Sequence, residues 1–498
     1  MGSLGSGSVK VMLGRVIVMG IGFACAPVMG RMFSPNEYGV ASLVETMVYW
    51  IAGFMSLGYA QAIPLAAETG DVRGLTRLSV LLNVALLAVM CMLVPVCGKY
   101  AAQWFGEPEL ERFMWFVPAL FFLSSLSDVI QYAFSQQGRF GALSLLLVLS
   151  MGLAKPLQIG LGWFFGGTGL MLLVGALLSG VLATAVAGMA LVPLLIGGDG
   201  GTAAMWAAAR RHRQFPRVQL WNAVLQATAF SAPALAIGTL FGSLVVGWFN
   251  MGRKLILIPV WVLAISLGQV FYPQAAAEWR RDGSSRESIM GTFRIVSMLC
   301  VFPTVCLCFL GPLLFAVFLG EKWFEAGVYA QLLAPYIIVT TFTGPMKWMF
   351  LVGNRAGRFL AYNVLAAVGG PLALAGGAWV ASWAVDWPIW LNGPRMGVFF
   401  YALASLLIEG NLVKDAVRLG GVRTADVAGV VTREIAVSAA LLLPAGLVFW
   451  AGGPRLVAVG LTVIATLAQF VILYRREEAV RRWVWKAIGL VWRGAVAS

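Results

Sequence analysis

Seven charged side chains interrupt long apolar stretches of the sequence, and they are the residues best placed to do chemistry. Five are cations and two are acids: Arg15, Glu45, Asp128, Lys155, Arg253, Lys254 and Lys347. A Lys or Arg at the centre of a membrane helix costs roughly 2.5–3.5 kcal/mol on insertion scales, so a retained cation usually faces a cavity or a partner. We therefore take Arg15, Lys155, Arg253 and Lys254 as candidate residues for binding an anion.

Two of these residues occupy related positions in the chain. Arg253 follows Glu45 by 208 residues, close to the spacing of an internal repeat. If two halves pack about a twofold axis, Glu45 and Arg253 approach each other near the outer end of a cavity and could form a gate, an ion pair that opens and closes. The alternative is that each charged side chain has its polar partners within its own half, or that it extends to the lipid interface.

The other candidates allow two interpretations each. We expect Lys155, in mid-helix, to face the cavity. Arg15 lies about one turn inside the membrane, where lining the cavity and reaching the interface are equally compatible with its position. We expect Lys347 to anchor at the interface. Asp128 could couple transport to an ion such as a proton, although an interfacial aspartate with satisfied hydrogen bonds is the simpler interpretation.

The sequence holds no conventional catalytic or metal-binding motif. Its single histidine, His212, lies in a basic loop, and its six cysteines all lie in apolar segments, where we interpret them as buried hydrophobic side chains. Nucleophile-elbow, zinc-protease and phosphate-loop patterns are absent from the sequence. We expect no cofactor, no metal and no enzymatic activity.

The elements that must position these residues are membrane helices. Of the 498 residues, 60% are hydrophobic and only 11% are charged, and the mean hydropathy is +0.86. Apolar runs of about 20 residues can cross the roughly 30 Å hydrocarbon core, and they lack the alternation of barrel strands. The sequence therefore predicts an all-α polytopic membrane protein of about fourteen helices, near 11–32, 38–62, 78–98, 113–134, 143–165, 169–196, 221–241, 245–273, 293–319, 328–353, 359–384, 396–413, 433–451 and 455–474.

The distribution of Lys and Arg predicts the orientation. With these helices, we count 22 basic residues in the loops and helix ends on the side of the N-terminus and 6 on the other side. The positive-inside rule then puts both termini in the cytoplasm. The net charge of +14 is mostly this topology signal. Because the basic residues are scattered over loops, we expect no nucleic-acid partner.

One sequence pattern occurs twice. A Ser-Leu-Gly triplet, a proline and a final glutamate recur about 210 positions apart, at residues 56–68 and 266–278. This predicts two parallel six-helix pseudo-repeats around a central cavity, followed by two C-terminal helices. The expected organisation is an N-lobe over 1–196, a basic cytoplasmic linker over 197–220, a C-lobe over 221–413, helices 13 and 14 within 433–474, and a tail over 475–498.

The tail combines apolar residues at helical spacing with Arg and Lys on another face. It is predicted to be an amphipathic helix that binds anionic lipid headgroups at the cytoplasmic surface. A frayed basic tail is the alternative.

Four segments resemble one family of membrane transporters, the polysaccharide flippases. The segments are Arg31 to Gly39 (RMFSPNEYG), Arg213 to Pro216 (RQFP), Val246-Gly247 with Arg253 and Pro259, and Gly268 to Ala276 (GQVFYPQAA). The family comprises Wzx-type flippases of O-antigen and lipopolysaccharide units, in the same MOP superfamily as MurJ-type lipid II flippases and MATE exporters. The resemblance is strongest over about 10–280.

The resemblance implies a bacterial inner-membrane protein that moves an undecaprenyl-diphosphate-linked oligosaccharide from the cytoplasmic to the periplasmic leaflet by alternating access, for cell-surface polysaccharides including exopolysaccharide. Family members have a cation-lined cavity between their lobes, a role that Arg15, Lys155 and Arg253 match best. A polysaccharide polymerase or glycosyltransferases of the same pathway would be protein partners. The family includes members with twelve and with fourteen helices.

Two other classes were weighed against the flippase. A MATE-like exporter of another solute shares the architecture, but it carries cations and needs an acidic cavity. A membrane glycosyltransferase, polymerase or ligase needs a large outer loop or an acidic catalytic pair. The longest outer loop, residues 98–112, is too short and its glutamates resemble a solvated face. The excess of buried cations favours the flippase.

Overall fold

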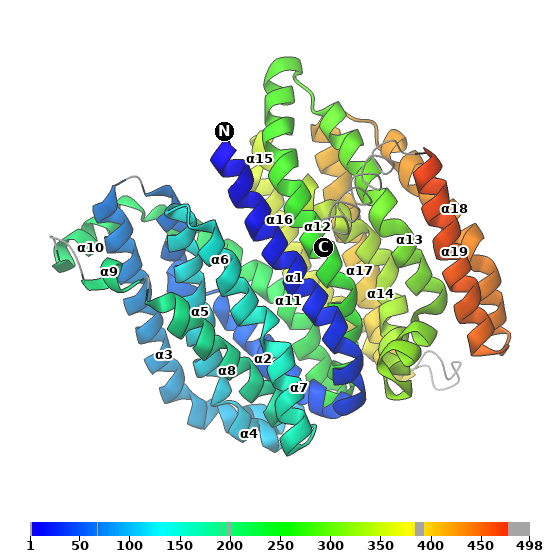
Figure 1. Ribbon diagram of the computed structural model, residues 1–498, viewed down its shortest axis with the longest axis horizontal. Helices are drawn as coiled ribbons and strands as arrows, with labels where there is room; N and C mark the ends of the chain where they lie inside the picture. Colours follow the sequence, from blue (N-terminus) through cyan, green and yellow to red (C-terminus); the bar gives the residue numbers. More distant parts are fainter. Residues whose placement is uncertain (1, 67, 190, 197–200, 384–392, 477–498) are drawn as a thin grey trace, which may run out of the picture.

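The computed structural model describes residues 2–66, 68–189, 191–196, 201–383 and 393–476, which are almost entirely helical (Figure 1). The predicted all-α membrane architecture is confirmed. Among the described residues, 12 helices are long and apolar enough to cross a membrane, and one bent pair makes a thirteenth. The number of fourteen stays a prediction. The longest of the described helices, α12 (Ser243–Asp282), has 40 residues and covers the predicted span 245–273, but it is not among these 12.

The helices form two groups with α1 lying across them (Figure 1). We call α1 to α8 the first lobe and α11 to α17 the second lobe. The first comprises α1 (Gly2–Met32), α2 (Pro35–Ala52), η1 (Met55–Leu65), α3 (Thr69–Phe105), α4 (Glu109–Phe113), α5 (Phe116–Gln136), α6 (Phe140–Leu147), η2 (Val148–Gly152), α7 (Ala154–Phe165) and α8 (Gly169–Gly188). Then follow α9 (Val192–Ile196), α10 (Gly201–Arg211) and η3 (Phe215–Gln219).

The second lobe comprises α11 (Leu220–Phe241), α12, α13 (Arg286–Leu319), η4 (Glu321–Trp323), α14 (Phe324–Met346), α15 (Met349–Val352), α16 (Ala356–Trp383) and α17 (Gly393–Leu419). Two further helices, α18 (Thr424–Trp450) and α19 (Arg455–Arg476), pack against α13 and each other. The predicted tail 475–498 lies outside the described residues beyond position 476.

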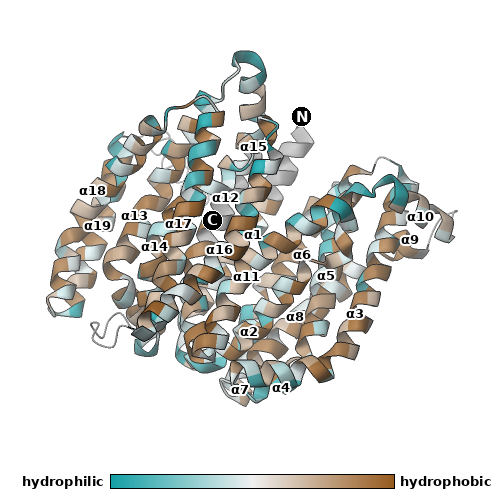
Figure 2. Ribbon diagram, turned by 180° about the vertical axis from the view of Figure 1, so that it is seen from behind, coloured by the Kyte–Doolittle hydropathy of each residue, from teal (hydrophilic) through white to brown (hydrophobic). Residues whose placement is uncertain are grey.

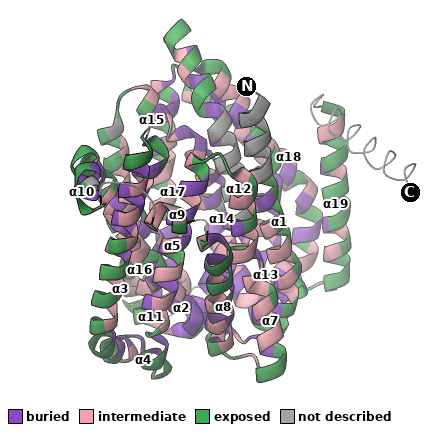
Figure 3. Cartoon of the chain, turned by 60° about the vertical axis from the view of Figure 1, so that its left-hand side comes forward, coloured by how far each residue is buried: buried purple, intermediate pink, exposed green. Residues whose placement is uncertain are grey.

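The surface has the polarity expected in a lipid bilayer. Hydrophobic residues cover the flanks of the helices, whereas hydrophilic residues gather at the helix ends (Figure 2). Buried residues concentrate in inner helices such as α2 and α14, and α19 exposes most of its length (Figure 3). Because each helix satisfies its own backbone hydrogen bonds, its apolar side chains can face lipid or other helices.

The start of α2 shows how the sequence sets a helix boundary. The Ser34 side chain accepts a hydrogen bond from the backbone N–H of Glu37 at 3.2 Å, and Pro35 occupies the first turn. Both features favour a helix N-terminus. The carboxylate of Glu37 also accepts a hydrogen bond from the backbone N–H of Gly169, the first residue of α8. This segment therefore fixes the ends of two neighbouring helices.

The first copy of the repeated pattern breaks its helix. Ser56, Leu57 and Gly58 have φ angles of 49°, 46° and 82°, and η1 is bent by 58° from α2. Such angles cost roughly 1–3 kcal/mol at each non-glycine residue. The side-chain oxygen of Asn83 on α3 stabilises the break, since it accepts hydrogen bonds from the N–H and the hydroxyl of Ser56 at 2.9 and 3.1 Å. The predicted single helix 38–62 is thus corrected to a bent pair, whereas residues 266–268 continue α12.

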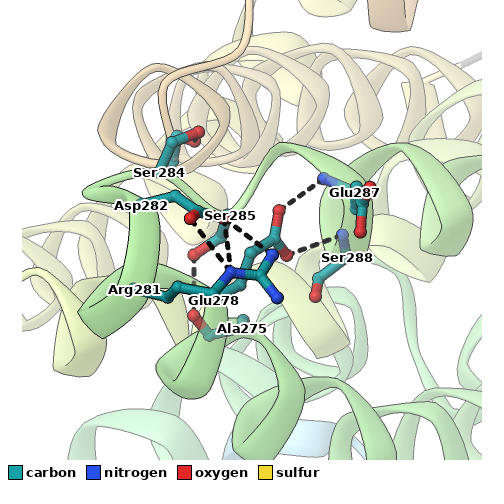
Figure 4. A network of polar contacts seen from close by, with 9 residues as sticks. Ala275, Glu278, Arg281, Asp282, Ser284, Ser285, Glu287 and Ser288 are labelled. Carbon is teal, nitrogen blue, oxygen red and sulfur yellow. Dashed lines mark hydrogen bonds and ion pairs between the residues drawn. The ribbon is translucent and has the colours of Figure 1, made fainter.

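The glutamate of the second copy caps the next helix. Figure 4 shows the Glu278 carboxylate at the start of α13, where it accepts hydrogen bonds from the backbone N–H groups of Glu287 and Ser288 at 2.7 and 3.0 Å. Free N–H groups at a helix N-terminus favour a carboxylate. In the adjacent turn, the hydrogen bond from Arg281 holds the pKa of Asp282 below its ordinary value. The repeated glutamate here has a structural role.

The described part of the predicted linker contains the helix α10, which is attached to the first lobe. Ala209 is buried against Leu78 of α3. Arg211 donates hydrogen bonds to Asp71 at 2.6 Å and to Glu68, the glutamate of the first copy, at 3.3 Å. The two copies of the pattern thus use their final glutamates in different ways.

Candidate functional site

The helices α2 and α12 cross at two glycines that the sequence repeat relates. Gly39 packs against the carbonyl oxygen of Ser243, and Gly247 packs against that of Pro35. Gly39 and Gly247, and likewise Pro35 and Ser243, are separated by 208 positions. A methyl group at either glycine would overlap with backbone atoms, so this approach requires glycine. The contact is reciprocal, as a twofold relation between the lobes would require.

A second reciprocal pair of contacts lies at the same end of the molecule. Gly30 of α1 packs against Leu319 of α13, and Gly238 of α11 packs against Phe105 of α3. The buried indole of Trp323 donates a hydrogen bond to the carbonyl oxygen of Gly30 at 2.7 Å. We call these contacts, with the α2–α12 crossing, the closed end. It lies opposite the N-terminus, at the far end of α1 (Figure 1).

One ion pair joins the lobes further along the same two helices. The Nζ atom of Lys254 on α12 lies 2.6 Å from Oε2 of Glu45 on α2, and both side chains are about one-third exposed. Lys155 of α7 is near enough to Glu45 to interact with it electrostatically, and it donates a hydrogen bond to Gln158 at 3.0 Å. We call Glu45, Lys155 and Lys254 the interlobe cluster. With two ammonium groups and one carboxylate, it has an excess of positive charge.

The predicted Glu45–Arg253 pair is corrected by this arrangement. Consecutive helical residues point about 100° apart, so Arg253 and Lys254 cannot both face α2. Lys254 makes the ion pair with Glu45, and Arg253 points into the second lobe. The ion pair between the lobes therefore involves the residue that follows the one indicated by the 208-residue spacing.

Arg253 is a buried cation between aromatic rings. It is 3% exposed, and its guanidinium carbon lies 4.2 and 5.0 Å from the ring centroids of Phe230 and Phe249. One guanidinium nitrogen donates to the carbonyl oxygen of Phe230 at 2.8 Å, while Nε is buried without a hydrogen-bond partner. Arg253 takes part in none of the ion pairs among the described residues. Because burial of such a charge is costly, an anion beside it would be stabilising.

A cavity of about 810 Å³ lies in the second lobe, between α11, α12, α14, α16 and α17. Arg253 lines it, and Tyr49 of α2 reaches it from the first lobe. The cavity runs from Tyr336 in the middle of α14 to Lys347 just beyond the end of that helix, away from the closed end. This cavity lies mainly within one lobe, so it differs from the predicted cavity between the lobes, which stays a prediction.

Two further charges line the cavity. Lys347, expected to be an interface anchor, is corrected to a lining residue, and its ammonium nitrogen lies 5.8 Å from the ring centroid of Trp348. Glu409 of α17 was missed by sequence reasoning, although it lies ten residues before the end of an apolar helix. Its carboxylate accepts a hydrogen bond from the hydroxyl of Thr343 at 3.0 Å. The lining therefore holds two cations and one acid.

Arg15 and Asp128 line neither this cavity nor the interlobe cluster. Arg15 is half-buried on α1, next to Gly14, which packs against Ser144 of α6. Asp128 is half-buried on α5 and accepts a hydrogen bond from Gln131 at 2.9 Å. That bond fits the simpler interpretation, an aspartate whose hydrogen bonds are satisfied.

The charges near the junction of the lobes are unbalanced. Arg253, Lys254 and Lys155 place three cations near the junction of the lobes, against one acid, Glu45. In a region of low dielectric constant, such an excess attracts and orients an anion. Among the described residues, no group of His, Cys, Asp or Glu is arranged to hold a metal ion.

The fold is shared with known transporters. The chain resembles the lipid II flippase MurJ in an inward closed conformation, with a TM-score of 0.63 and 11% identity over 94% of this chain and 98% of that one. It resembles an inward-facing multidrug resistance MATE transporter of the MOP superfamily, with a TM-score of 0.62 and 13% identity over 82% of this chain and 99% of that one. At these identities, the likeness concerns the fold alone.

The chain also resembles a third structure, whose description concerns the polarity of its binding pocket. It is a MOP superfamily transporter from Pyrococcus furiosus, whose reversed binding-pocket polarity is said to suggest a different function. The chain matches it with a TM-score of 0.56 and 14% identity over 83% of this chain and 96% of that one.

A search of curated proteins finds no match. The family comparison is more specific than the structural one, because it covers more than half of the chain. Residues 28–327 match the family described as polysaccharide biosynthesis protein. This range includes α2, α12 and all three residues of the interlobe cluster. The chain therefore belongs to the polysaccharide biosynthesis protein family and has the fold of the MOP transporter superfamily.

Proposed function

We propose that this protein is a flippase that moves an undecaprenyl-diphosphate-linked oligosaccharide from the cytoplasmic to the periplasmic leaflet of the bacterial inner membrane. The observation that carries the proposal is the excess of positive charge at the junction of the lobes. Lys254 pairs with Glu45, Lys155 interacts electrostatically with the same carboxylate at longer range, and the nearby Arg253 is buried without an acidic partner among the described residues. This excess of positive charge suits a diphosphate anion.

The physical task of such a protein is to lower a desolvation barrier. A diphosphate carries about two negative charges and cannot enter hydrocarbon alone, whereas its isoprenoid tail can remain in lipid. Cations in a polar cavity replace part of the water around the headgroup. We take this arrangement as one of the two end states of alternating access, because the helices pack closely at the closed end and the lining of the second-lobe cavity extends away from it.

The Glu45–Lys254 pair supplies a way for the ligand to act on the lobes. A diphosphate that binds Lys254 competes with Glu45 for the same ammonium group. Binding would thus weaken an ion pair that joins α2 to α12, and the lobes could then separate at the closed end. No bond in the ligand is made or broken. The direction of transport would be set by removal of the product by a polymerase or glycosyltransferase, or by an ion gradient.

The experiment is a transbilayer assay in proteoliposomes. A fluorescent undecaprenyl diphosphate sugar is placed in one leaflet, and its appearance in the other is measured for the wild type, Arg253→Ala and Lys155→Ala. We expect both variants to lose at least about tenfold in rate, a loss of at least about 1.4 kcal/mol in transition-state stabilisation. The control is Lys99→Ala, which removes an exposed cation at the far end of α3.

The alternative is a MATE-like exporter of another solute. Such an exporter carries cations and needs acidic side chains inside the membrane, and Glu45 and Glu409 are two of these. The MATE structures also share the fold. A wild-type protein that moves organic cations but no lipid-linked sugar would establish the exporter and refute the flippase.

A further inference from the structure

We propose that the second-lobe cavity is a saccharide subsite, separate from the interlobe cluster that would hold the diphosphate. The inference rests on the proposed function and assigns the two parts of the substrate to two places. The sugar enters the cavity between α12, α14, α16 and α17. The diphosphate stays between Lys155 and Lys254 at the junction of the lobes.

The first argument is the aromatic lining. Eight of the lining residues are Phe, Tyr or Trp. The rings of Tyr272 and Trp348 lie 5.2 Å apart at 43°, and those of Tyr336 and Tyr401 lie 6.0 Å apart at 68°. Each pair combines apolar ring carbons with a polar hydroxyl or indole N–H group. Sugar rings carry C–H groups on their faces and hydroxyls on their edges, so they fit surfaces that are apolar in the middle and polar at the rim.

The second argument is the supply of fixed polar groups. The hydroxyl of Tyr362 donates to Asp415 at 2.8 Å, and the amide of Asn363 donates to Asn222 at 2.9 Å, so both lining side chains are held by residues behind them. Glu409 offers a carboxylate to accept from a ligand hydroxyl. A hydroxyl-rich ligand needs such donors and acceptors at set positions, because each unmatched polar group would be costly.

The third argument is the position of the cavity beside the cluster. Arg253 lines the cavity and Lys254, the next residue, makes the interlobe ion pair. On α2, Tyr49 lines the cavity one turn after Glu45, the partner of Lys254. A ligand with its diphosphate at Lys254 therefore has its sugar directed past Arg253 into the cavity.

Other occupants fit the lining less well. An isoprenoid tail gains nothing from Lys347 and Glu409, whose charges it would desolvate. An organic cation would be repelled by Arg253 and Lys347. A bare diphosphate would not use the eight aromatic side chains. The volume of about 810 Å³ is within the range of roughly 300–1,000 Å³ found for small-molecule sites.

The test separates the sugar from the diphosphate. Dissociation constants are measured on the purified full-length protein for bare undecaprenyl diphosphate and for the same lipid bearing glucose, galactose or N-acetylglucosamine. We expect at least one sugar to tighten binding to the wild type by about tenfold or more. Trp348→Ala should abolish that gain and leave the dissociation constant of the bare lipid unchanged. Glu409→Gln, which nearly preserves shape, should also reduce the gain.

The matched control is Trp379→Ala, which removes an indole that is 62% exposed on α16, away from the cavity lining. It should keep the full gain. The subsite is refuted if the bare lipid binds and none of the three sugars adds affinity, or if the gain survives in both cavity variants. Failure of the wild type to bind any of these lipids would instead overturn the proposed function itself.

Discussion

Arg253 and Lys254 show how two neighbouring cations can serve different sites. Lys254 reaches across to Glu45 of the first lobe, and Arg253 stacks between Phe230 and Phe249 inside the second. The sequence identified both as intramembrane charges, but the prediction that Arg253 meets Glu45 was wrong. α12 is apolar on nearly all sides, so its sequence does not show which face meets α2, and a one-residue error turns a side chain by about 100°.

The interlobe ion pair can be measured by a double-mutant cycle. We expect Glu45→Gln and Lys254→Met each to lower the free energy of unfolding, and the double variant to lose less than the sum. Since both side chains are about one-third exposed, the coupling should be about 1–3 kcal/mol, between values for surface and buried pairs. Denaturation in detergent of the four proteins gives the coupling. Additive losses would show that the pair contributes no interaction energy.

Arg253 should not be replaceable by lysine. Its planar guanidinium stacks on two rings and donates to the carbonyl oxygen of Phe230 at the same time. An ammonium group keeps the charge but not the stacked, forked geometry. We expect Arg253→Lys to reduce transbilayer movement nearly as much as Arg253→Ala. The proteoliposome assay measures this. Wild-type activity in the lysine variant would mean that charge alone suffices at this position.

At the scale of elements, helix starts have local causes, whereas breaks depend on distant residues. Ser34 and Pro35 set the start of α2 three residues before the predicted span 38–62, because its capping groups are local. The break at Ser56 depends on Asn83, which is 27 residues away along the chain, and the same Ser-Leu-Gly triplet remains helical in α12. Local pattern alone could not distinguish the two copies. The extra length of α12 and the helix α10 were missed for a related reason, since both extend beyond the apolar spans.

The glycine crossing of α2 and α12 should control how tightly the closed end seals. We expect Gly247→Ala to separate the two helices, because the added methyl group would overlap with the carbonyl group of Pro35. Spin labels at Glu109→Cys in the first lobe and Ala451→Cys, in the turn between α18 and α19, should then move apart, as electron-spin distance measurements can show. These positions are exposed.

Gly20→Ala is the control for this crossing, because a methyl group at Gly20 has no other heavy atom within 4 Å. It should leave the spin-label distance and the melting temperature unchanged. If Gly247→Ala behaves like Gly20→Ala in both measurements, the close approach of the two helices does not determine the state of this end.

For the whole molecule, composition predicted the class and the repeat predicted a relation between the lobes, but not where the cavity lies. The 208-residue spacing reappears in the reciprocal contacts of Gly39 and Gly247. The lobes nevertheless differ in their interiors. The second lobe holds Arg253, Lys347 and Glu409 around its cavity, and the sequence could not show that these charges from distant segments line one cavity. That convergence is set by helix packing between distant segments.

Locking the closed end should stop transport reversibly. The hydroxyl of Ser243 on α12 lies 2.5 Å from the side-chain oxygen of Asn36 on α2, so cysteines at these two positions would be close enough to pair. In a background without the six native cysteines, we expect oxidised Asn36→Cys/Ser243→Cys to bind lipid-linked diphosphate but to lose transbilayer movement. Reduction should restore it.

The control for the lock is a disulfide at the same end of the molecule but within one lobe. A Cβ atom at Gly98 of α3 would lie 3.6 Å from the Cβ atom of Met114, between α4 and α5, and both residues belong to the first lobe. Because alternating access moves one lobe against the other, Gly98→Cys/Met114→Cys should stay active when oxidised. An equal loss of transbilayer movement in both oxidised variants would indicate that the lobes do not move as units. Full activity of the oxidised interlobe pair would mean that the ligand crosses without opening the closed end.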